Sequence, residues 1–223
     1  MIRNFCPGFI RSVASIVFPY YCPECQTEKI DGKGWICEDC WRQLEPAGKG
    51  KWNVNPSLVE RVFVAFHYGE IARKLVHQMK FYGRTDIAEE FGQRAAEFLM
   101  LGDTHWKFDA IFPIPLHPVR IRERGYDQNL LIAGRVAEVT GLPLRTDLVR
   151  RVKHTTAQSR LSDSERLTNL RGAFRPISSV KASLPDSILI VDDVIHTGAT
   201  ILSCMEALNS FYRPQTYILA VCG

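Results

Sequence analysis

Short apolar runs alternate with amphipathic stretches along most of the chain. The runs end in turn or loop residues and predict strands at residues 61–68, 109–115, 187–193 and 216–223. Stretches with apolar residues at helical spacing lie between these runs, over 69–83, 85–102, 127–141 and 198–211. Strands that are apolar throughout and alternate with helices are typical of a parallel sheet covered on both faces. The pattern therefore predicts an α/β fold with a mostly parallel sheet.

The first fifty residues follow a different pattern. Apolar residues at helical spacing predict a lead-in helix over residues 1–20, and a cysteine-containing segment follows over 21–45. The stretch 45–57 is polar and contains Gly and Pro, which indicates a linker. We therefore expect two domains, a small one over 1–50 and a larger one over 51–223.

Composition limits the class of protein. An apolar content of 46% is ordinary for a globular chain and argues against disorder. The longest apolar runs are far shorter than a membrane-spanning helix requires. The N-terminal stretch is interrupted by Arg11 and has no convincing small-residue cleavage site. We therefore expect a cytoplasmic protein without membrane insertion.

Four of the seven cysteines form two C-x2-C pairs, Cys22 with Cys25 and Cys37 with Cys40, separated by eleven residues. Four thiolates at such spacing can surround a zinc ion as a tetrahedron. Disulfides are the alternative, but the cytosol keeps thiols reduced. Because four cysteines leave no open coordination position, the sequence predicts a structural zinc ribbon and no catalytic zinc.

The strand at 187–193 ends in two adjacent carboxylates, Asp192 and Asp193, and Gly198 then opens a helix between Thr197 and Thr200. Ligands of parallel sheets bind outside the carboxyl ends of the strands. Carboxylates accept hydrogen bonds from vicinal hydroxyls and can reach a magnesium shell, whereas amides at a helix N-terminus bind phosphate. The stretch therefore predicts a site for a ribose 5-phosphate. The alternative is that Asp192 only caps the helix and Asp193 is solvated.

Residues 188–200 resemble the 5-phosphoribosyl-1-pyrophosphate (PRPP) binding motif of type I phosphoribosyltransferases. The resemblance implies that Asp192 and Asp193 bind the ribose hydroxyls of PRPP, which arrives with Mg²⁺. It also implies that the following backbone binds the 5-phosphate; these residues are Ile195, His196, Thr197, Gly198, Ala199 and Thr200. His196 stands where many relatives carry a small hydroxyl residue, and its side chain can point to solvent.

Further stretches are similar to the ComF family, in order across residues 18–223. They read FPYYCPECQ…WICEDCWRQLEP, YGEIARKLVHQMKFYGR, PIPLHPVRIRERGYDQN and TTAQSRLSDSERLTNLRGAF. The last is polar and basic, and its Ser162-x-x-Glu165 capping box predicts a short helix. The resemblance implies a phosphoribosyltransferase-like fold behind an N-terminal zinc ribbon, and a role in natural competence.

Three arginines alternate in the segment after the 109–115 strand: Arg120, Arg122 and Arg124. We expect an extended loop here, with Gly125 placed to act as a hinge. Alternate side chains of an extended loop project to one side, where they can converge on a pyrophosphate or a nucleic-acid backbone. Type I transferases cover the pyrophosphate with a mobile loop at this place, so the resemblance implies a catalytic role for the three arginines. The alternative is an exposed basic loop without a ligand. We expect Gln128 and Asn129 to start the next helix.

The formal net charge of +4 is unevenly distributed. Residues 115–175 carry 12 Lys and Arg against 6 Asp and Glu, a net of +6, so the remainder of the chain is slightly acidic. A localised excess favours an anionic partner, although a solvated face is the alternative. Tryptophans 35, 41 and 52 near the cysteines could stack bases or pack.

Two functional classes remain open at this point. In the first, a PRPP-binding protein handles incoming single-stranded DNA during competence, alone or with other competence proteins. In the second, an active phosphoribosyltransferase of nucleotide metabolism releases pyrophosphate with magnesium. The sequence does not decide whether the protein is an enzyme.

Overall fold

The computed structural model describes residues 20–22, 24–29, 36–48, 58–102, 106–154, 170–178 and 183–223. The chain forms two compact units, Met1–Leu44 and Glu45–Gly223. Nearly all of the predicted lead-in helix, and the helix predicted at Ser162, lie outside the described residues.

The first unit is a small hairpin followed by a short helix. Strands β1 (Tyr20–Tyr21) and β2 (Glu28–Lys29) pair antiparallel, and α2 spans Glu38–Arg42. Among the residues of this unit that the structure describes, the buried side chains are Cys22, Ile36, Cys40, Trp41 and Leu44. Because Trp41 is only 4% exposed, it packs in this core and does not offer a face to a base.

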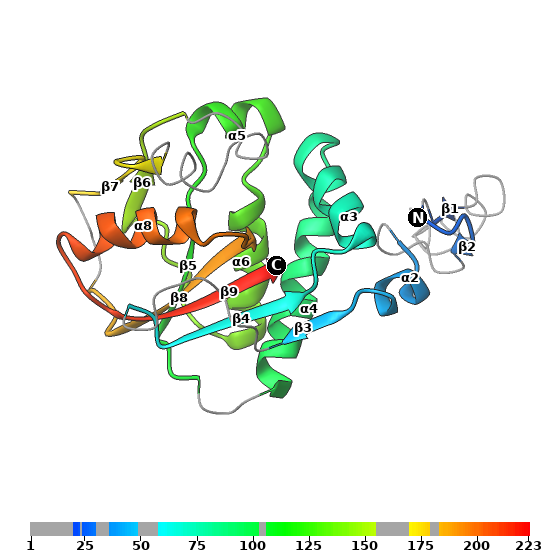
Figure 1. Ribbon diagram of the computed structural model, residues 1–223, viewed down its shortest axis with the longest axis horizontal. Coiled ribbons are helices and arrows are strands. Elements are labelled where there is room, and N and C mark those ends of the chain that lie inside the picture. The colour runs from blue at the N-terminus through cyan, green and yellow to red at the C-terminus, as the bar shows by residue number, and fades with distance from the viewer. Residues whose placement is uncertain are drawn as a thin grey trace, which may run out of the picture. The chain divides into compact units, whose positions relative to one another are not determined.

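The second unit is built on a five-stranded sheet in the order β3-β4-β9-β8-β5 (Figure 1). Four strands run parallel, namely β4 (Arg61–Phe66), β9 (Gln215–Cys222), β8 (Ser187–Val194) and β5 (Ala110–Pro113). Only β3 (Pro46–Gly48), which the sequence placed in the linker, pairs antiparallel at the edge. The predicted mostly parallel sheet is confirmed.

Helices cover both faces of this sheet, as predicted (Figure 1). On one face, α8 (Ala199–Asn209) and the hairpin of β6 (Val149–Arg151) with β7 (Phe174–Pro176) pack over Ile188 and Ile190. Leu189 and Val191 point the other way, because side chains alternate along a strand. Helices α4 (Thr85–Gly102) and α6 (Gln128–Thr140) lie against that second face. Helix α3 spans Glu70–Phe81 and packs on α4.

Helices α4 and α6 approach closely at Gly92. A Cβ built there would lie 2.6 Å from the Ile132 carbonyl oxygen and 2.9 Å from Cβ of Arg135. Only a residue without a side chain fits between the two backbones. This contact fixes α6, whose first turn reaches the carboxyl end of β8, against α4.

The segment predicted as an extended loop is a helix, α5, over Pro118–Arg124. Pro118 stands at the first helical position, where a missing N–H costs nothing. His117 caps the helix by accepting a hydrogen bond at Nδ1 from the Val119 amide, at 3.2 Å. Gly125 ends it with a left-handed φ of 84°. The prediction of a loop was therefore wrong.

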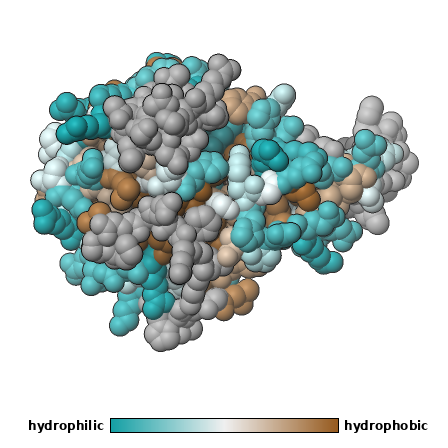
Figure 2. All heavy atoms as spheres, in the orientation of Figure 1, coloured by the Kyte–Doolittle hydropathy of each residue, from teal (hydrophilic) through white to brown (hydrophobic). Residues whose placement is uncertain are grey.

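The face shown in Figure 2 carries mostly hydrophilic residues, with hydrophobic ones in scattered groups between them. Such scattering is normal for a protein surface. Among the described residues, no helix combines the length and the apolar character needed to cross a membrane.

Candidate functional site

Asp192 and Asp193 lie at the carboxyl end of β8, the strand between β9 and β5. The two residues are only 7% and 5% exposed. Carboxylates are rarely buried to this extent unless they are paired or hydrogen-bonded. Their surroundings must therefore supply donors.

Side chains from two helices provide these donors. From the first turn of α6, Gln128 Nε2 donates to Asp193 Oδ2 and Asn129 Nδ2 donates to Asp192 Oδ1, each at 2.9 Å. From the last turn of α3, Lys80 Nζ lies 3.0 Å from both carboxylate oxygens of Asp193. Asp193 is thus held by a cation and an amide, whereas the donors to Asp192 within the described ranges are the Asn129 side-chain amide and the Asp193 backbone amide.

The electrostatics of the pair follow from this difference. Burial and the neighbouring Asp193 raise the pKa of Asp192 to about 7, and the Lys80 ammonium opposes the shift. Oδ1 of Asp192 accepts from Asn129 and from the Asp193 amide at 3.0 Å, and Oδ2 accepts from none of the described residues. One oxygen of Asp192 is therefore left for a ligand.

The chain after β8 forms a small pocket lined by Asp192 and by residues 194–201. Gly198 takes a left-handed φ of 71° at the start of α8, and the Thr197 hydroxyl accepts from the Ala199 amide at 3.4 Å. Ile195 is buried, and its own amide donates to the Cys222 carbonyl at 2.8 Å. The amide of Ile195 is thus used by the sheet, and the predicted phosphate contacts concentrate on residues 196–200.

His196 does not point freely into solvent. Although the residue is exposed, its ring packs edge-on against Tyr68, with 5.1 Å between the ring centroids. Tyr68 follows β4, the strand beyond β9, and its amide donates to the Gly223 carbonyl. The ends of β4, β8 and β9 therefore meet beside the pocket.

The three arginines of α5 do not project to one side as the extended loop required. Arg120 pairs with Glu123 at 2.9 Å, Arg122 is exposed, and Arg124 is half-buried with its guanidinium 5.8 Å from the centre of the Phe81 ring. Burial lowers the pKa of Arg124, and the attraction of Asp193 opposes that shift. Of the three arginines, Arg124 is therefore the one whose charge is attracted by Asp193.

Sequence reasoning missed the residues that support the aspartates. Gln128 and Asn129 do start α6, as predicted, but they also hold the two carboxylates. Lys80 comes from a helix more than a hundred residues away along the chain. Burial lowers the pKa of Arg151 and Asp192 opposes the shift, which places another cation near the pair. The only sequence signal was two adjacent amide side chains in the first turn of an apolar helix.

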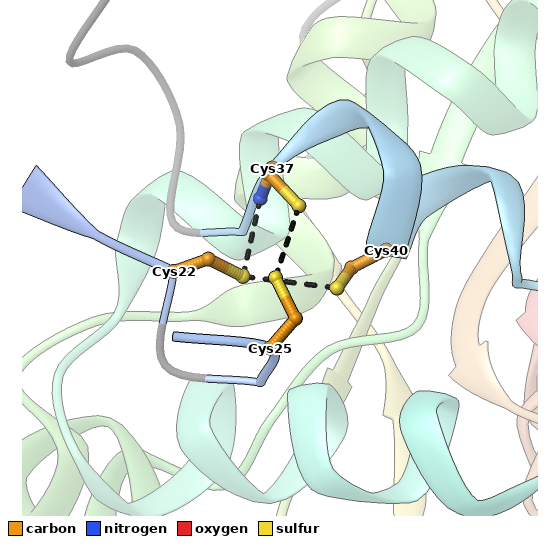
Figure 3. A group of neighbouring side chains, drawn as sticks. All are labelled: Cys22, Cys25, Cys37 and Cys40. Atoms are coloured by element: carbon orange, nitrogen blue, oxygen red, sulfur yellow. Dashed lines mark hydrogen bonds between the residues drawn. The ribbon is translucent and has the colours of Figure 1, made fainter. Parts of the chain in front are cut away.

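The four predicted cysteines meet in the first unit (Figure 3). Their sulfurs all lie within 4.8 Å of one another, with 3.7 Å between Cys22 and Cys40 and 3.5 Å between Cys25 and Cys37. Sulfurs around a tetrahedral zinc, with bonds of about 2.3 Å, lie about 3.8 Å apart. The cluster therefore fits one zinc ion and could bind such a metal.

Hydrogen bonds favour the thiolate form of Cys22 and Cys25, whereas burial raises the pKa of the Cys37 and Cys40 thiols. The Cys37 amide donates to Cys22 Sγ at 3.4 Å, as expected where a tight turn presents amides to a metal-bound sulfur. The Thr27 hydroxyl lies 3.2 Å from Cys25 Sγ and lowers the pKa of that thiol to about 6. A thiolate is the form that binds metal.

Several solved structures of low identity match parts of the chain, and two of them show the level of similarity. A glutamine PRPP amidotransferase from B. subtilis matches with a TM-score of 0.42 and 15% identity, over 65% of this chain and 30% of its own. A hypoxanthine phosphoribosyltransferase from Staphylococcus aureus matches with a TM-score of 0.35 and 17% identity, over 59% of this chain and 62% of its own. No family profile matches the sequence.

Curated relatives match over most of the chain. Competence protein F of Haemophilus influenzae is 30% identical over 212 residues, which cover 93% of this chain and 85% of that protein. DNA utilization protein YhgH of Salmonella typhi is 28% identical over 184 residues, covering 78% and 77% respectively. Identity at this level over nearly the whole chain agrees with the motifs quoted above. The chain belongs to the family of Competence protein F, the ComF family.

Proposed function

We propose that this protein binds PRPP together with Mg²⁺ and acts on incoming single-stranded DNA during natural competence. One observation supports the PRPP site above all others. Two carboxylates are fixed at the carboxyl end of β8, directly beside a pocket formed by the turn before α8 and the first residues of that helix. A ribose 5-phosphate carries a diol and a phosphate at different ends, so its diol suits the carboxylates and its phosphate suits the pocket.

In the proposed complex the ribose hydroxyls donate to Asp192 and Asp193. The open oxygen of Asp192 suits this role, because a hydroxyl can donate to it without displacing Asn129. The 5-phosphate lies on residues 196–200, where the amides at the start of α8 and the hydroxyls of Thr197 and Thr200 offer donors. The pocket beside Asp192 is small and polar enough for a single phosphate group.

The residues present also fit magnesium. Mg²⁺ takes oxygen ligands and usually keeps several waters, so it needs only one or two carboxylates and the oxygens of the substrate. Asp192 and Asp193 would supply the carboxylates. Bound there, the ion would neutralise part of the charge of the pyrophosphate.

The competence role rests on the relatives and on charge. The relatives carry the names Competence protein F and DNA utilization protein. The excess of positive charge over residues 115–175 supplies an attraction for a phosphate backbone. We expect binding of single strands without sequence preference, with an affinity that falls steeply as salt rises. Binding that is independent of salt would contradict this part of the proposal.

Transferase activity is the second candidate function, and the cations near the aspartates favour it. Asp193 attracts the guanidinium of Arg124, and Asp192 attracts that of Arg151. Loss of pyrophosphate from PRPP needs stabilisation of the leaving group more than it needs a strong base. If the protein catalyses the transfer, replacing Arg120, Arg122 and Arg124 by alanine should reduce the rate of pyrophosphate release far more than it reduces the affinity for PRPP. Undiminished release of pyrophosphate by the triple variant would contradict the role of the α5 arginines in stabilising the leaving group.

Calorimetric titration with PRPP, with and without Mg²⁺, tests the proposed site. Asp192→Ala together with Asp193→Ala should abolish binding while the thermal transition persists. Asp186→Asn is the matched control, because Asp186 is an exposed carboxylate just before the opposite end of β8. If the double variant binds PRPP as tightly as the unmodified protein, the site lies elsewhere.

A further inference from the structure

An exposed aromatic cluster ends helix α3, one residue after the lysine that holds Asp193. Phe81 is 64% exposed and Tyr82 is 63% exposed, more than any other Phe, Tyr or Trp side chain in the described part of the chain. His77 packs against both rings, with centroid distances of 4.8 Å to Phe81 and 5.6 Å to Tyr82. The neighbouring rings form one contiguous apolar surface in water, which is the kind of surface that interaction sites use.

A cation completes the cluster. The Arg124 guanidinium lies 5.8 Å from the centre of the Phe81 ring, within the range of a cation–π contact. Among the described residues, no carboxylate oxygen lies within 4.0 Å of this guanidinium, so its charge remains available to an anion. The cluster thus joins aromatic faces to a positive charge.

The cluster is held in place by the residues around it. The Tyr126 hydroxyl donates to the Met79 carbonyl, which fastens the chain after α5 to the last turn of α3. Lys80 fastens the same turn to Asp193 through its 3.0 Å contacts. Rings on such an anchored turn lose little freedom on binding, which favours affinity.

We propose that Phe81 and Tyr82, with Arg124 beside them, form a stacking platform for a base of single-stranded DNA next to the PRPP site. Single-strand binding proteins combine aromatic faces for the bases with cations for the backbone. The guanidinium beside the ring adds an attraction for the phosphates of a strand, which an apolar segment of another protein does not carry. An open surface also suits a strand better than a free base, which needs an enclosing pocket. This inference rests on the DNA-handling part of the proposed function, and it assigns contact with a base to the end of α3.

Binding of two strands tests the platform. Fluorescence anisotropy at low salt would compare oligothymidylate with an abasic strand of equal length, which keeps the phosphates and lacks the bases. The unmodified protein should bind oligothymidylate at least about fivefold more tightly, since stacking of one base contributes that much. The variant with both Phe81→Ala and Tyr82→Ala should bind the two strands equally. Phe81→Trp, which keeps a stacking face, should preserve the preference.

Phe211→Ala is the matched control. Phe211 is also an exposed aromatic residue that follows a helix and packs near a second ring, Tyr212, but it precedes the amino end of β9. This variant should retain the preference for bases. Because Phe81 and Tyr82 are exposed, the double variant should also keep its thermal midpoint and its affinity for PRPP.

The outcomes separate the platform from the wider proposal. A base preference that survives in the double variant would overturn the platform and leave DNA binding intact. Failure of the unmodified protein to bind either strand would overturn the DNA-handling function itself. Saturable binding of free thymidine without a base preference between strands would overturn the choice of DNA as the occupant.

Discussion

Asp192 is the residue at which stability and ligand binding conflict most clearly. The unfolded carboxyl is ionised above pH 4, whereas burial and Asp193 raise the folded pKa to about 7. Between these values the folded state binds more protons than the unfolded state. The free energy of unfolding of the ligand-free protein therefore falls as pH rises through this window.

Asp192→Asn should therefore raise the thermal midpoint of the ligand-free protein at pH 8. The amide keeps an oxygen for Asn129 and removes the buried charge. We expect a rise of at least about 2 °C, the shift that about 1 kcal/mol produces in a domain of this size. The difference between variant and unmodified protein should shrink toward pH 5, where the folded carboxyl is protonated. A difference that does not change with pH would contradict the raised pKa.

Some residues of the site were predictable from the sequence, and others were not. Asp192 and Asp193 were predicted because they follow an apolar strand directly, and that signal is local. Lys80 and Arg151 were missed as partners because their relation to the pair arises only when distant elements pack together. No spacing in the sequence relates such residues to each other.

Helix α5 illustrates the limits of periodicity at the scale of elements. Apolar periodicity correctly predicted α3, α4, α6 and α8, because each buries an apolar stripe. Helix α5 buries no residue and rests on local signals at its ends, Pro118 and the His117 cap before it and Gly125 after it. A helix without an apolar face gives no periodic pattern, so it was predicted as a loop.

The contact between α4 and α6 gives a test at this scale. Gly92→Ala places a methyl group 2.6 Å from the Ile132 carbonyl oxygen. Overpacking of this kind costs about 1–3 kcal/mol in the free energy of unfolding. Denaturant titration should therefore show a clear loss of stability.

Gly134→Ala is the matched control for that substitution. Gly134 lies within α6, and a Cβ built there meets nothing within 4 Å. Alanine should raise the free energy of unfolding by about 0.5–1 kcal/mol, because glycine is a poor helix former. Equal effects of the two substitutions would show that the helices do not approach at Gly92.

At the scale of the whole molecule, two units depend on different sources of stability. The larger unit has an extensive apolar core, whereas the described core of the first unit consists of five buried side chains, two of which are cysteines. A core this small rarely holds a fold without a metal or disulfides. We therefore infer that zinc stabilises the first unit.

Cys25→Ser tests the metal without disturbing the core, because Cys25 is exposed. The unmodified protein should contain one zinc per chain, and the variant should lose it. Proteolysis within residues 20–45 should accelerate, while the thermal transition of the larger unit stays unchanged. Cys25→His, which retains a ligand atom, should keep the metal. Zinc-free unmodified protein, purified without chelators, would contradict the prediction.

A crystal structure with PRPP and Mg²⁺ would test the central claim most directly. We predict electron density for the ribose hydroxyls at Asp192 and Asp193 and for the 5-phosphate at residues 196–200. Gln128, Asn129 and Lys80 should keep their contacts with the two carboxylates. PRPP bound away from the end of β8, or no density at a concentration that saturates binding in solution, would contradict the account.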